Sequence, residues 1–295
     1  MVKTLFDRSD ISKRNSVLLI LFFFIFVALI GWLFGELSGW SYWGLGIAAS
    51  ISTVMIFVNY YHGDKIVLSI SGAKLVSKND YPHLFHTVDG LSIAAGIPKP
   101  KLYVINSNAL NAFATGRDPK HASIAITKGL INRLNRKEVE GVISHEMSHI
   151  KNYDIRFMTL VSVLVGIVTL LSEWFVRMTF WGGNRNRKSA NGVLMIIGLV
   201  LMILAPFIGL LIKFSISRKR EFLADADGAL LTRYPEGLAS ALEKISKDGN
   251  ELKSASNATA HMFISNPFKK KNAMVNLFST HPSVKERIKA LMTLK

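Results

Sequence analysis

Two long apolar segments near the N-terminus place the strongest constraint on how this chain folds. Residues 17–34 and 42–61 contain no Asp, Glu, Lys or Arg, and each has about the length of the ~20-residue helix that crosses a hydrocarbon core. Backbone polar groups in such a core have no water to bind, so the segment must satisfy them internally as a helix. The sequence therefore predicts an N-terminal transmembrane hairpin over residues 1–62.

A second pair of apolar segments follows later in the chain. Hydrophobic residues make up 49% of the sequence and the mean hydropathy is +0.29, which is more apolar than a typical soluble protein of this size. Residues 193–212 predict a full span, whereas the run at residues 160–172 is short and is followed by Glu173 and Arg177. We expect a second transmembrane hairpin over residues 156–214, with a buried core helix as the alternative for its first half.

The distribution of positive charge predicts the orientation in the membrane. Basic residues precede the first span and none lies in the turn at residues 35–41, so the positive-inside rule places the N-terminus and residues 63–154 in the cytoplasm. The net charge of +16 agrees with contact to anionic lipid headgroups. Because the charges flank apolar spans instead of alternating with aromatic residues, nucleic-acid binding is disfavoured.

One loop opposes this orientation. Between the third and fourth apolar segments the chain carries Arg185, Arg187 and Lys188, which would lie outside the cytoplasm. Either the basic residues that flank the second pair of segments outweigh this loop, or the second pair does not span the membrane.

Residues 145–149 form an H-E-x-x-H sequence. On a helix, this spacing places the imidazoles of His145 and His149 one above the other with the carboxylate of Glu146 beside them. A helix is expected because Asn135 can act as N-cap with Glu138 as its capping-box partner. The arrangement is typical of a zinc site in which the two histidines bind the metal and Glu146 is the general base.

A catalytic zinc needs a third protein ligand and keeps one position open. Glu221 and Asp225 lie four residues apart, on one face if this segment is a helix. We expect Glu221 to be the third metal ligand and Asp225 to hydrogen-bond the outer nitrogen of His145, which would fix the orientation of that ring. The alternative is a solvated face on which both carboxylates pair with Arg218 and its basic neighbours.

With these residues in place, the chain resembles the membrane-embedded zinc metalloproteases of the HtpX type, which are related to the CaaX prenyl endoproteases. The matching segments are HEMSHIKNYD at residues 145–154, SR at 217–218, EFxAD at 221–225, NAFATG at 111–116 and HP at 281–282. The resemblance covers most of the chain and shows no departure at the metal site. It implies a membrane-bound endopeptidase of protein quality control and stress response in a bacterial cytoplasmic (inner) membrane, with one Zn²⁺ per chain.

The resemblance also implies three further site residues. His281 would lie near the zinc and donate a hydrogen bond to the oxyanion, while Asn111 and Ala114 would lie near the substrate cleft. Taken alone, a histidine before Pro282 is more typical of a surface loop that precedes a helix, with the proline in the first helical turn.

The segment between the two hairpins predicts a small domain that contains both helix and strand. Residues 81–95 have a helical pattern, residues 101–106 predict a strand, and residues 111–115 and 123–127 predict an antiparallel pair. If this pair borders the metal site, an extended substrate chain could add to its edge as a further strand. The alternative is an ordinary structural hairpin.

The expected fold is mainly α with a small antiparallel β-sheet, and the resemblance implies an integral membrane, zincin-like metalloprotease with two transmembrane hairpins. The predicted organisation has an N-terminal hairpin (1–62), a catalytic segment (63–155), a second hairpin (156–214) and a second catalytic segment (215–295). Both catalytic segments are expected on the cytoplasmic side.

The predicted reaction is zinc-assisted hydrolysis of peptide bonds in membrane or unfolded proteins, with Glu146 as the base. The chain has no cysteine, which excludes a thiol nucleophile and disulfides. One alternative is a zinc-stabilised membrane adaptor or transporter, although a purely structural zinc site is normally closed by a fourth ligand. The other is a processing protease for lipidated peptides, for which the chain has few spans to enclose a chamber. Membrane lipids are expected partners in each case.

Overall fold

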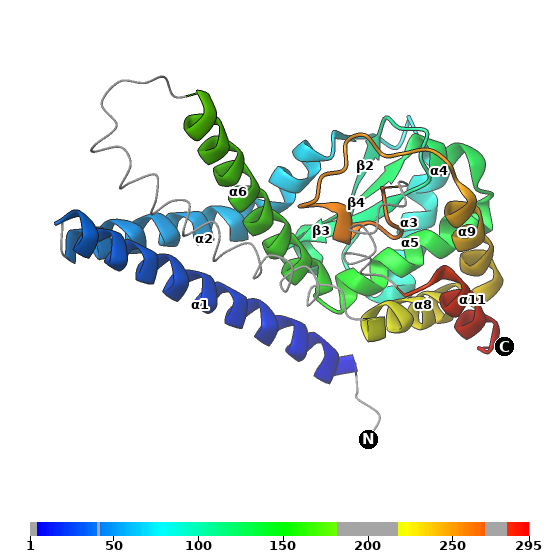
Figure 1. The fold of residues 1–295 in the computed structure, drawn as a ribbon. Helices are drawn as coiled ribbons and strands as arrows, with labels where there is room; N and C mark the ends of the chain where they lie inside the picture. Colours follow the sequence, from blue (N-terminus) through cyan, green and yellow to red (C-terminus); the bar gives the residue numbers. More distant parts are fainter. Residues whose placement is uncertain (1–4, 40–41, 182–217, 269–281, 295) are drawn as a thin grey trace.

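The computed structural model describes residues 5–39, 42–181, 218–268 and 282–294. Two long helices, α1 (Leu5–Ser38) and α2 (Tyr42–Ile70), form a hairpin that projects from the domain containing the sheet (Figure 1). Both are long and apolar enough to cross a membrane, which confirms the two N-terminal membrane helices. The helix α2 continues past residue 62 to Ile70, so its last turns extend into the segment that the sequence predicts to be catalytic.

The two membrane helices approach closely where both carry glycine. A Cβ added at Gly44 would lie 2.4 Å from the carbonyl oxygen of Gly31 and 2.7 Å from Cα of Gly35. Small residues at such a contact let helix backbones pack together within a bilayer. Large apolar side chains on the two helices are exposed, as expected for a surface that contacts lipid; they include Val17, Leu21, Ile25, Ile51, Val54 and Phe57.

A four-stranded sheet forms the β part of the domain. The strands are β1 (Ala73–Leu75), β2 (Lys101–Ile105), β3 (Ala112–Gly116) and β4 (Ala122–Thr127), in the order β1-β2-β4-β3. The predicted antiparallel pair is confirmed, because β3 and β4 pair in that direction with Ala114 opposite Ile124. The order of the strands places β3 at one edge of the sheet.

The fold class is confirmed with one correction: the sheet is mixed and not antiparallel throughout. The strands β2 and β4 run parallel, with Tyr103 opposite Ala125. After β2 the chain crosses to the outer edge to form β3, and a turn containing the 3₁₀ helix η1 (Pro119–His121) brings it back between the two as β4. The strand β1 has only three residues, which is too short to give an alternating pattern.

The helix α5 (Arg136–Lys151) is the central helix of the domain. It packs against α3 (Pro82–Ala95), α8 (Arg218–Thr232), α9 (Pro235–Lys247) and the strand β3. The buried side chains of Ile143, Met147 and Ile150 anchor it in the main apolar core. The remaining short elements are α4 (Lys128–Arg133), the 3₁₀ helix η2 (Ala260–Met262) and α11 (Val284–Met292).

The helix α6 (Asp154–Trp181) follows α5 after a bend of 86°. Between them Tyr153 has a left-handed φ of 61°, and α6 then packs against α1 and α2 (Figure 1). If α5 and α6 count as one bent span, the described residues hold up to three spans by length and composition, and otherwise two. The fourth apolar segment, residues 193–212, lies outside the described residues, so the second hairpin and the domain boundaries stay predictions.

Candidate metal centre

A capping box fixes the start of α5. The Asn135 side chain accepts a hydrogen bond from the Glu138 N–H at 3.0 Å, and Glu138 accepts one from the Asn135 N–H at 2.8 Å, as the sequence predicts. Glu138 also accepts hydrogen bonds from Ser240 and Lys244 of α9 at 2.6 and 2.8 Å. The first turn of α5 is thereby held against α9, and the phase of the helix is set for the motif two turns later.

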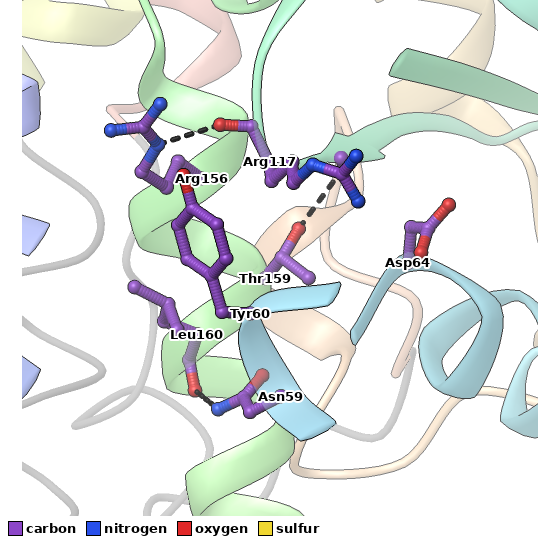
Figure 2. Close-up of a pocket in the computed structure, with 8 residues that line it drawn as sticks. Asn59, Tyr60, Asp64, Arg117, Arg156, Thr159 and Leu160 are labelled. Carbon is purple, nitrogen blue, oxygen red and sulfur yellow. Dashed lines mark hydrogen bonds between the residues drawn. The ribbon is translucent and has the colours of Figure 1, made fainter. Parts of the chain in front are cut away.

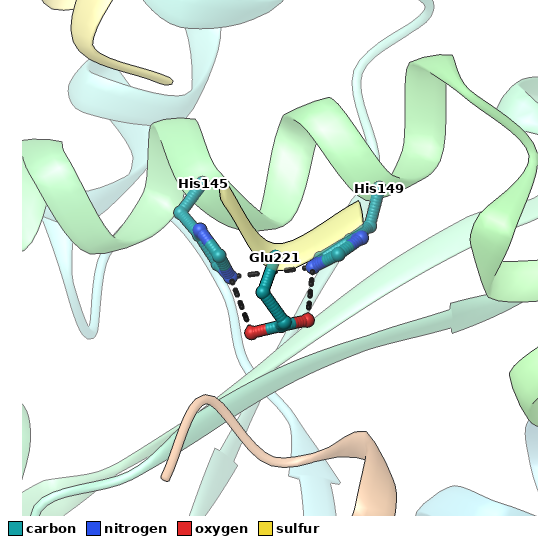
Figure 3. Close-up of side chains that lie close together, drawn as sticks. All are labelled: His145, His149 and Glu221. Carbon is teal, nitrogen blue, oxygen red and sulfur yellow. Dashed lines mark hydrogen bonds and ion pairs between the residues drawn. The ribbon is translucent and has the colours of Figure 1, made fainter. Parts of the chain in front are cut away.

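Three side chains from α5 and α8 converge on one point (Figure 3). The Nε2 atoms of His145 and His149 are 3.2 Å apart. The Glu221 carboxylate bridges them, with Oε1 3.5 Å from Nε2 of His149 and Oε2 3.9 Å from Nε2 of His145. One ligand atom from each residue lies within 4.8 Å of the others, and all three residues are buried. The sequence-predicted ligands therefore form a candidate metal site.

Each histidine of this cluster has a carboxylate on its outer nitrogen. Nδ1 of His145 lies 2.9 Å from Oδ1 of Asp225, the pairing that the sequence predicts. Nδ1 of His149 lies 3.2 Å from Oδ2 of Asp154, a partner that the sequence pattern does not predict. A carboxylate on Nδ1 favours the tautomer whose Nε2 presents its lone pair to a metal.

Arg287 of α11 is a second residue that sequence reasoning missed. Its guanidinium donates to Asp225 at 2.6 and 2.8 Å and to the carbonyl oxygen of Ile264 at 3.1 Å. It also lies 3.5 Å from Glu221, and only 1% of the residue is exposed. One sequence signal exists: Arg287 falls on the apolar stripe of α11, four residues before the buried Leu291, where a solvated arginine is not expected.

Burial and neighbouring charges set the proton affinities of the site. Burial raises the pKa of Glu146 from 4.5 to about 7, with the positive charge of His149 opposing the rise and the Glu221 carboxylate adding to it. Burial lowers the pKa of His149, but hydrogen bonds and charges from Asp154 and Glu221 outweigh it and raise the pKa to about 10. In the metal-free protein, the pKa values of Glu146 and His149 are therefore both above their ordinary values, whereas burial lowers the pKa of His145.

Glu146 also contacts the sheet. The backbone N–H of Ala114 on the edge strand β3 donates a hydrogen bond to its carboxylate. Asn111 precedes β3, and its side-chain amide donates to the carbonyl oxygen of Ser265 at 3.0 Å. Asn111 and Ala114 are both buried. The structure therefore places Ala114 beside the candidate base, and Asn111 against the segment that follows η2.

The remaining predicted site residue, His281, lies outside the described residues. The helix after it differs slightly from the expectation, because α11 begins at Val284 and Ser283 is its N-cap. Ser283 and Glu286 form a capping box, so Pro282 precedes the N-cap and is not part of the first helical turn.

A separate small pocket lies between α2, α6 and the turn after β3 (Figure 2). The Arg156 Nε donates to the carbonyl oxygen of Arg117 at 2.6 Å, and the Asn59 amide donates to the carbonyl oxygen of Leu160 at 3.3 Å. None of its lining residues belongs to the metal cluster. These contacts join α2 to α6, and α6 to the turn that follows β3.

Comparison with known proteins identifies the family. The model of "Peptidase family M48" matches residues 79–295. The protease HtpX homolog of Dictyoglomus thermophilum is 45% identical over 98% of this chain and 94% of its own length. The homolog of Caldanaerobacter subterraneus is 44% identical (99% and 98%), and that of Listeria monocytogenes serotype 4a is 41% identical (97% and 99%).

A solved structure is also similar in part. The crystal structure of S. mikatae Ste24p matches 84% of this chain and 64% of that chain at 20% sequence identity, with a TM-score of 0.46. The sequence matches, the candidate metal cluster and the two membrane helices agree with one another. The chain therefore belongs to peptidase family M48 and is a membrane-bound metalloprotease.

Proposed function

We propose that this metalloprotease is a zinc-dependent endopeptidase that cleaves misfolded or damaged membrane proteins, in protein quality control under stress. The observation that carries the proposal is the convergence of His145, His149 and Glu221, with Glu146 on the same helix, in a chain of family M48. These three residues are the proposed metal ligands, and Asp225 is the proposed partner that orients His145.

The chemistry of the cluster suits a zinc ion. Two imidazole nitrogens and one carboxylate oxygen are a ligand set of catalytic zinc. The Nε2 atoms of His145 and His149 are 3.2 Å apart, and ligands of a tetrahedral zinc ion lie roughly 3.3 Å from one another. Among the residues that the structure describes, this cluster contains no fourth His, Cys, Asp or Glu. One Zn²⁺ per chain would thus keep a position open for water and substrate.

When bound, zinc supplies Lewis-acid chemistry that acidifies a water molecule and polarises the carbonyl group of the scissile peptide bond. Glu146 takes the proton of the attacking water as general base and passes it to the leaving amine. Burial supports this role, because a carboxylate whose pKa is raised to about 7 in the metal-free protein accepts protons readily near neutral pH. His281 is the proposed hydrogen-bond donor to the oxyanion.

The edge strand β3 is the proposed docking site for an extended substrate. Its outer edge lies beside Glu146, because the Ala114 N–H already donates to that carboxylate. Next to it, the carbonyl oxygen of Ala112 accepts a hydrogen bond from the Ile264 N–H at 3.0 Å. A substrate that pairs with β3 through backbone hydrogen bonds would displace the segment around Ile264, and would need no particular side-chain sequence.

The proposed location is the bacterial inner membrane with the metal centre facing the cytoplasm. The N-terminal end of α1 lies beside the catalytic domain (Figure 1), and this end carries the basic residues Lys13 and Arg14, which favour the cytoplasmic side. Because α5 leads directly into α6 and α6 packs on both membrane helices, the metal centre lies close to the membrane. Substrates embedded in the same membrane are thus within reach.

The first experiment compares wild type, Glu146→Gln and Glu140→Gln as full-length proteins in detergent. Glu140 lies on the same helix but is partly exposed, so it controls for loss of a carboxylate on α5. We expect one zinc per chain in all three proteins, and cleavage of an unfolded membrane protein by wild type and Glu140→Gln only. Zinc binding without cleavage by wild type would favour a zinc-stabilised adaptor or transporter, and equal cleavage by all three would remove Glu146 as the base.

The comparisons do not favour the adaptor, the transporter or a processing protease for lipidated peptides. The last of these is tested with the same preparations. A prenylated peptide and an unmodified peptide of the same sequence are offered to the wild type. Cleavage of the prenylated peptide alone would contradict the proposal that the protease recognises substrates through backbone hydrogen bonds.

Orientation is tested with single cysteines, which have no background because the chain contains none. Tyr42→Cys lies at the start of α2 and is 75% exposed, while Lys247→Cys lies at the end of α9 on the catalytic domain and is also exposed. A membrane-impermeant maleimide should label Lys247→Cys in inverted vesicles and Tyr42→Cys in right-side-out vesicles. The opposite pattern would place the metal centre outside the cytoplasm.

A further inference from the structure

The first membrane helix reaches the metal centre through Asp154. This residue begins α6, immediately after the bend, and its Oδ2 lies 3.2 Å from Nδ1 of His149. Its Oδ1 accepts a hydrogen bond from the hydroxyl of Ser12 on α1 at 2.8 Å. Arg220 of α8 also lies against Oδ1, at 3.3 Å. One carboxylate thus receives groups from the membrane hairpin, from the metal-ligand helix and from the helix that carries Glu221.

A buried serine in a helix does not need a partner on another helix, because its hydroxyl can donate to a carbonyl oxygen one turn earlier. In the same hairpin, Ser16, Ser50 and Thr53 donate to carbonyl oxygens one turn earlier on their own helices, at 2.8 to 2.9 Å. Ser12 is as buried as Ser16, with 3% and 1% of the two residues exposed, yet the Ser12 hydroxyl reaches a carboxylate 142 residues away. A hydrogen bond from a hydroxyl to a carboxylate is stronger than one to a neutral carbonyl, which accounts for this choice.

A neighbouring contact fixes the same end of α1. The ammonium group of Lys13 lies 4.4 Å from the centre of the Tyr153 ring, and Tyr153 is the residue of left-handed φ at the bend between α5 and α6. Ser12 and Lys13, which are consecutive on α1, therefore contact Asp154 and Tyr153, which are consecutive at the bend. The end of the membrane helix is docked onto the bend itself.

We propose that Ser12 is a positioning residue that couples the first membrane helix to the metal centre, because its hydroxyl holds Asp154 in the orientation that fixes the ring of His149. This inference rests on the proposed metal site. A carboxylate on the outer nitrogen of a metal-binding histidine sets its tautomer and direction, and loss of such a partner typically weakens metal affinity about 10–100-fold. Metal affinity therefore depends on α1 being seated against α6.

The test measures zinc affinity in full-length protein in detergent, by competition with a chelating dye. Ser12→Thr and Ser12→Val both introduce a β-branched side chain of nearly the same shape, and Val has a methyl group where Thr has the hydroxyl, so the packing defect should be similar in the two variants. We expect Ser12→Val to bind zinc about three- to tenfold more weakly than Ser12→Thr, less than the loss for a direct partner. Ser16→Val is the matched control, because Ser16 is buried one turn away and its hydroxyl donates to the carbonyl oxygen of Ser12 on its own helix. Its zinc affinity should stay within about twofold of wild type.

A double-mutant cycle shows whether Ser12 acts through Asp154. Asp154→Asn should weaken zinc binding about 10–100-fold, and Ser12→Val should add little to Asp154→Asn. Cobalt(II) in place of zinc gives a visible spectrum that reports ligand geometry. This spectrum should change in Ser12→Val but not in Ser16→Val. Equal zinc affinity of Ser12→Thr and Ser12→Val would overturn this inference but not the proposed function. The same holds if the effects of Ser12→Val and Asp154→Asn on zinc affinity are fully additive. Absence of zinc binding in wild type would overturn the proposed function and this inference with it.

Discussion

Arg287 and Asp225 form a two-pronged ion pair inside the protein, with N···O distances of 2.6 and 2.8 Å. Asp225 in turn contacts the outer nitrogen of His145 at 2.9 Å. The C-terminal helix α11 is thereby connected to a proposed metal ligand on α5. The guanidinium also holds the pKa of the Asp225 carboxyl below its ordinary value against the opposing effect of burial, so Asp225 stays ionised and accepts from the histidine.

Replacement of Arg287 should damage both stability and metal binding. Arg287→Met leaves the buried carboxylates of Asp225 and Glu221 without their guanidinium, and breaking a buried pair in this way costs about 3–5 kcal/mol. Arg287→Lys keeps the charge but not the two-pronged geometry, so zinc affinity should fall about 10-fold with a smaller loss of stability. Thermal unfolding and dye competition measure the two effects. Lys289→Met, an exposed position on the same helix, should change neither.

Metal-free protein should lose stability as the pH rises through the range set by Glu146. Folding raises the pKa of this carboxyl from 4.5 to about 7, so between these values the folded state holds a proton that the unfolded state releases. The free energy of unfolding therefore falls with pH, by about 3 kcal/mol over this window. Glu146→Gln cannot titrate, so its thermal midpoint should fall less between pH 4.5 and 7.5. Parallel pH profiles for the two proteins would contradict the burial of an ionisable Glu146.

Zinc affinity should rise with pH over the range where His149 is protonated. In the metal-free protein the pKa of His149 is raised to about 10 by Asp154 and Glu221, which outweigh burial, so a proton must leave before the nitrogen can bind a metal. Each ion bound then releases one proton, and the affinity should increase roughly tenfold per pH unit. Dye competition between pH 6.5 and 8.5 measures the slope. An affinity that does not change with pH would mean that His149 is neutral before the metal binds.

The close contact between α1 and α2 gives a prediction for the membrane hairpin. A Cβ at Gly44 would lie 2.4 Å from the carbonyl oxygen of Gly31, so Gly44→Ala forces the helices apart and should cost about 1–3 kcal/mol. At Gly46 an added Cβ has nothing within 4 Å, and Gly46→Ala is the matched control. Thermal unfolding in detergent compares the two variants. Equal unfolding temperatures would show that the helices do not pack through Gly44.

The structure confirms the sequence predictions that depend on spacing within one element. The capping box of Asn135 and Glu138 and the one-turn separation of His145 and His149 follow from helical geometry alone. The pairing of β3 with β4 follows from a short turn between two apolar runs. The prediction that Asp225 contacts His145 needed one further assumption. Because Glu221 and Asp225 share a helix face, a helix that directs Glu221 toward the two histidines also directs Asp225 toward them.

The contacts that the sequence did not predict join elements that are remote along the chain. The parallel pairing of β2 with β4 depends on β3 taking the outer edge first. Asp154 lies close to His149 in sequence, but it meets the outer nitrogen only because the chain bends by 86° at Tyr153. The hydrophobic pattern of the sequence does not predict the angle between two consecutive helices.

The sequence by itself determined the membrane hairpin and the residues of the candidate metal cluster, because apolar length and helical spacing act within single segments. Only the tertiary structure decided which groups support that cluster. Ser12, Asp154 and Arg287 come from three different helices, and each is a polar side chain whose partner is chosen by how those helices pack. A buried polar group must be satisfied somewhere, but the sequence does not say by which residue.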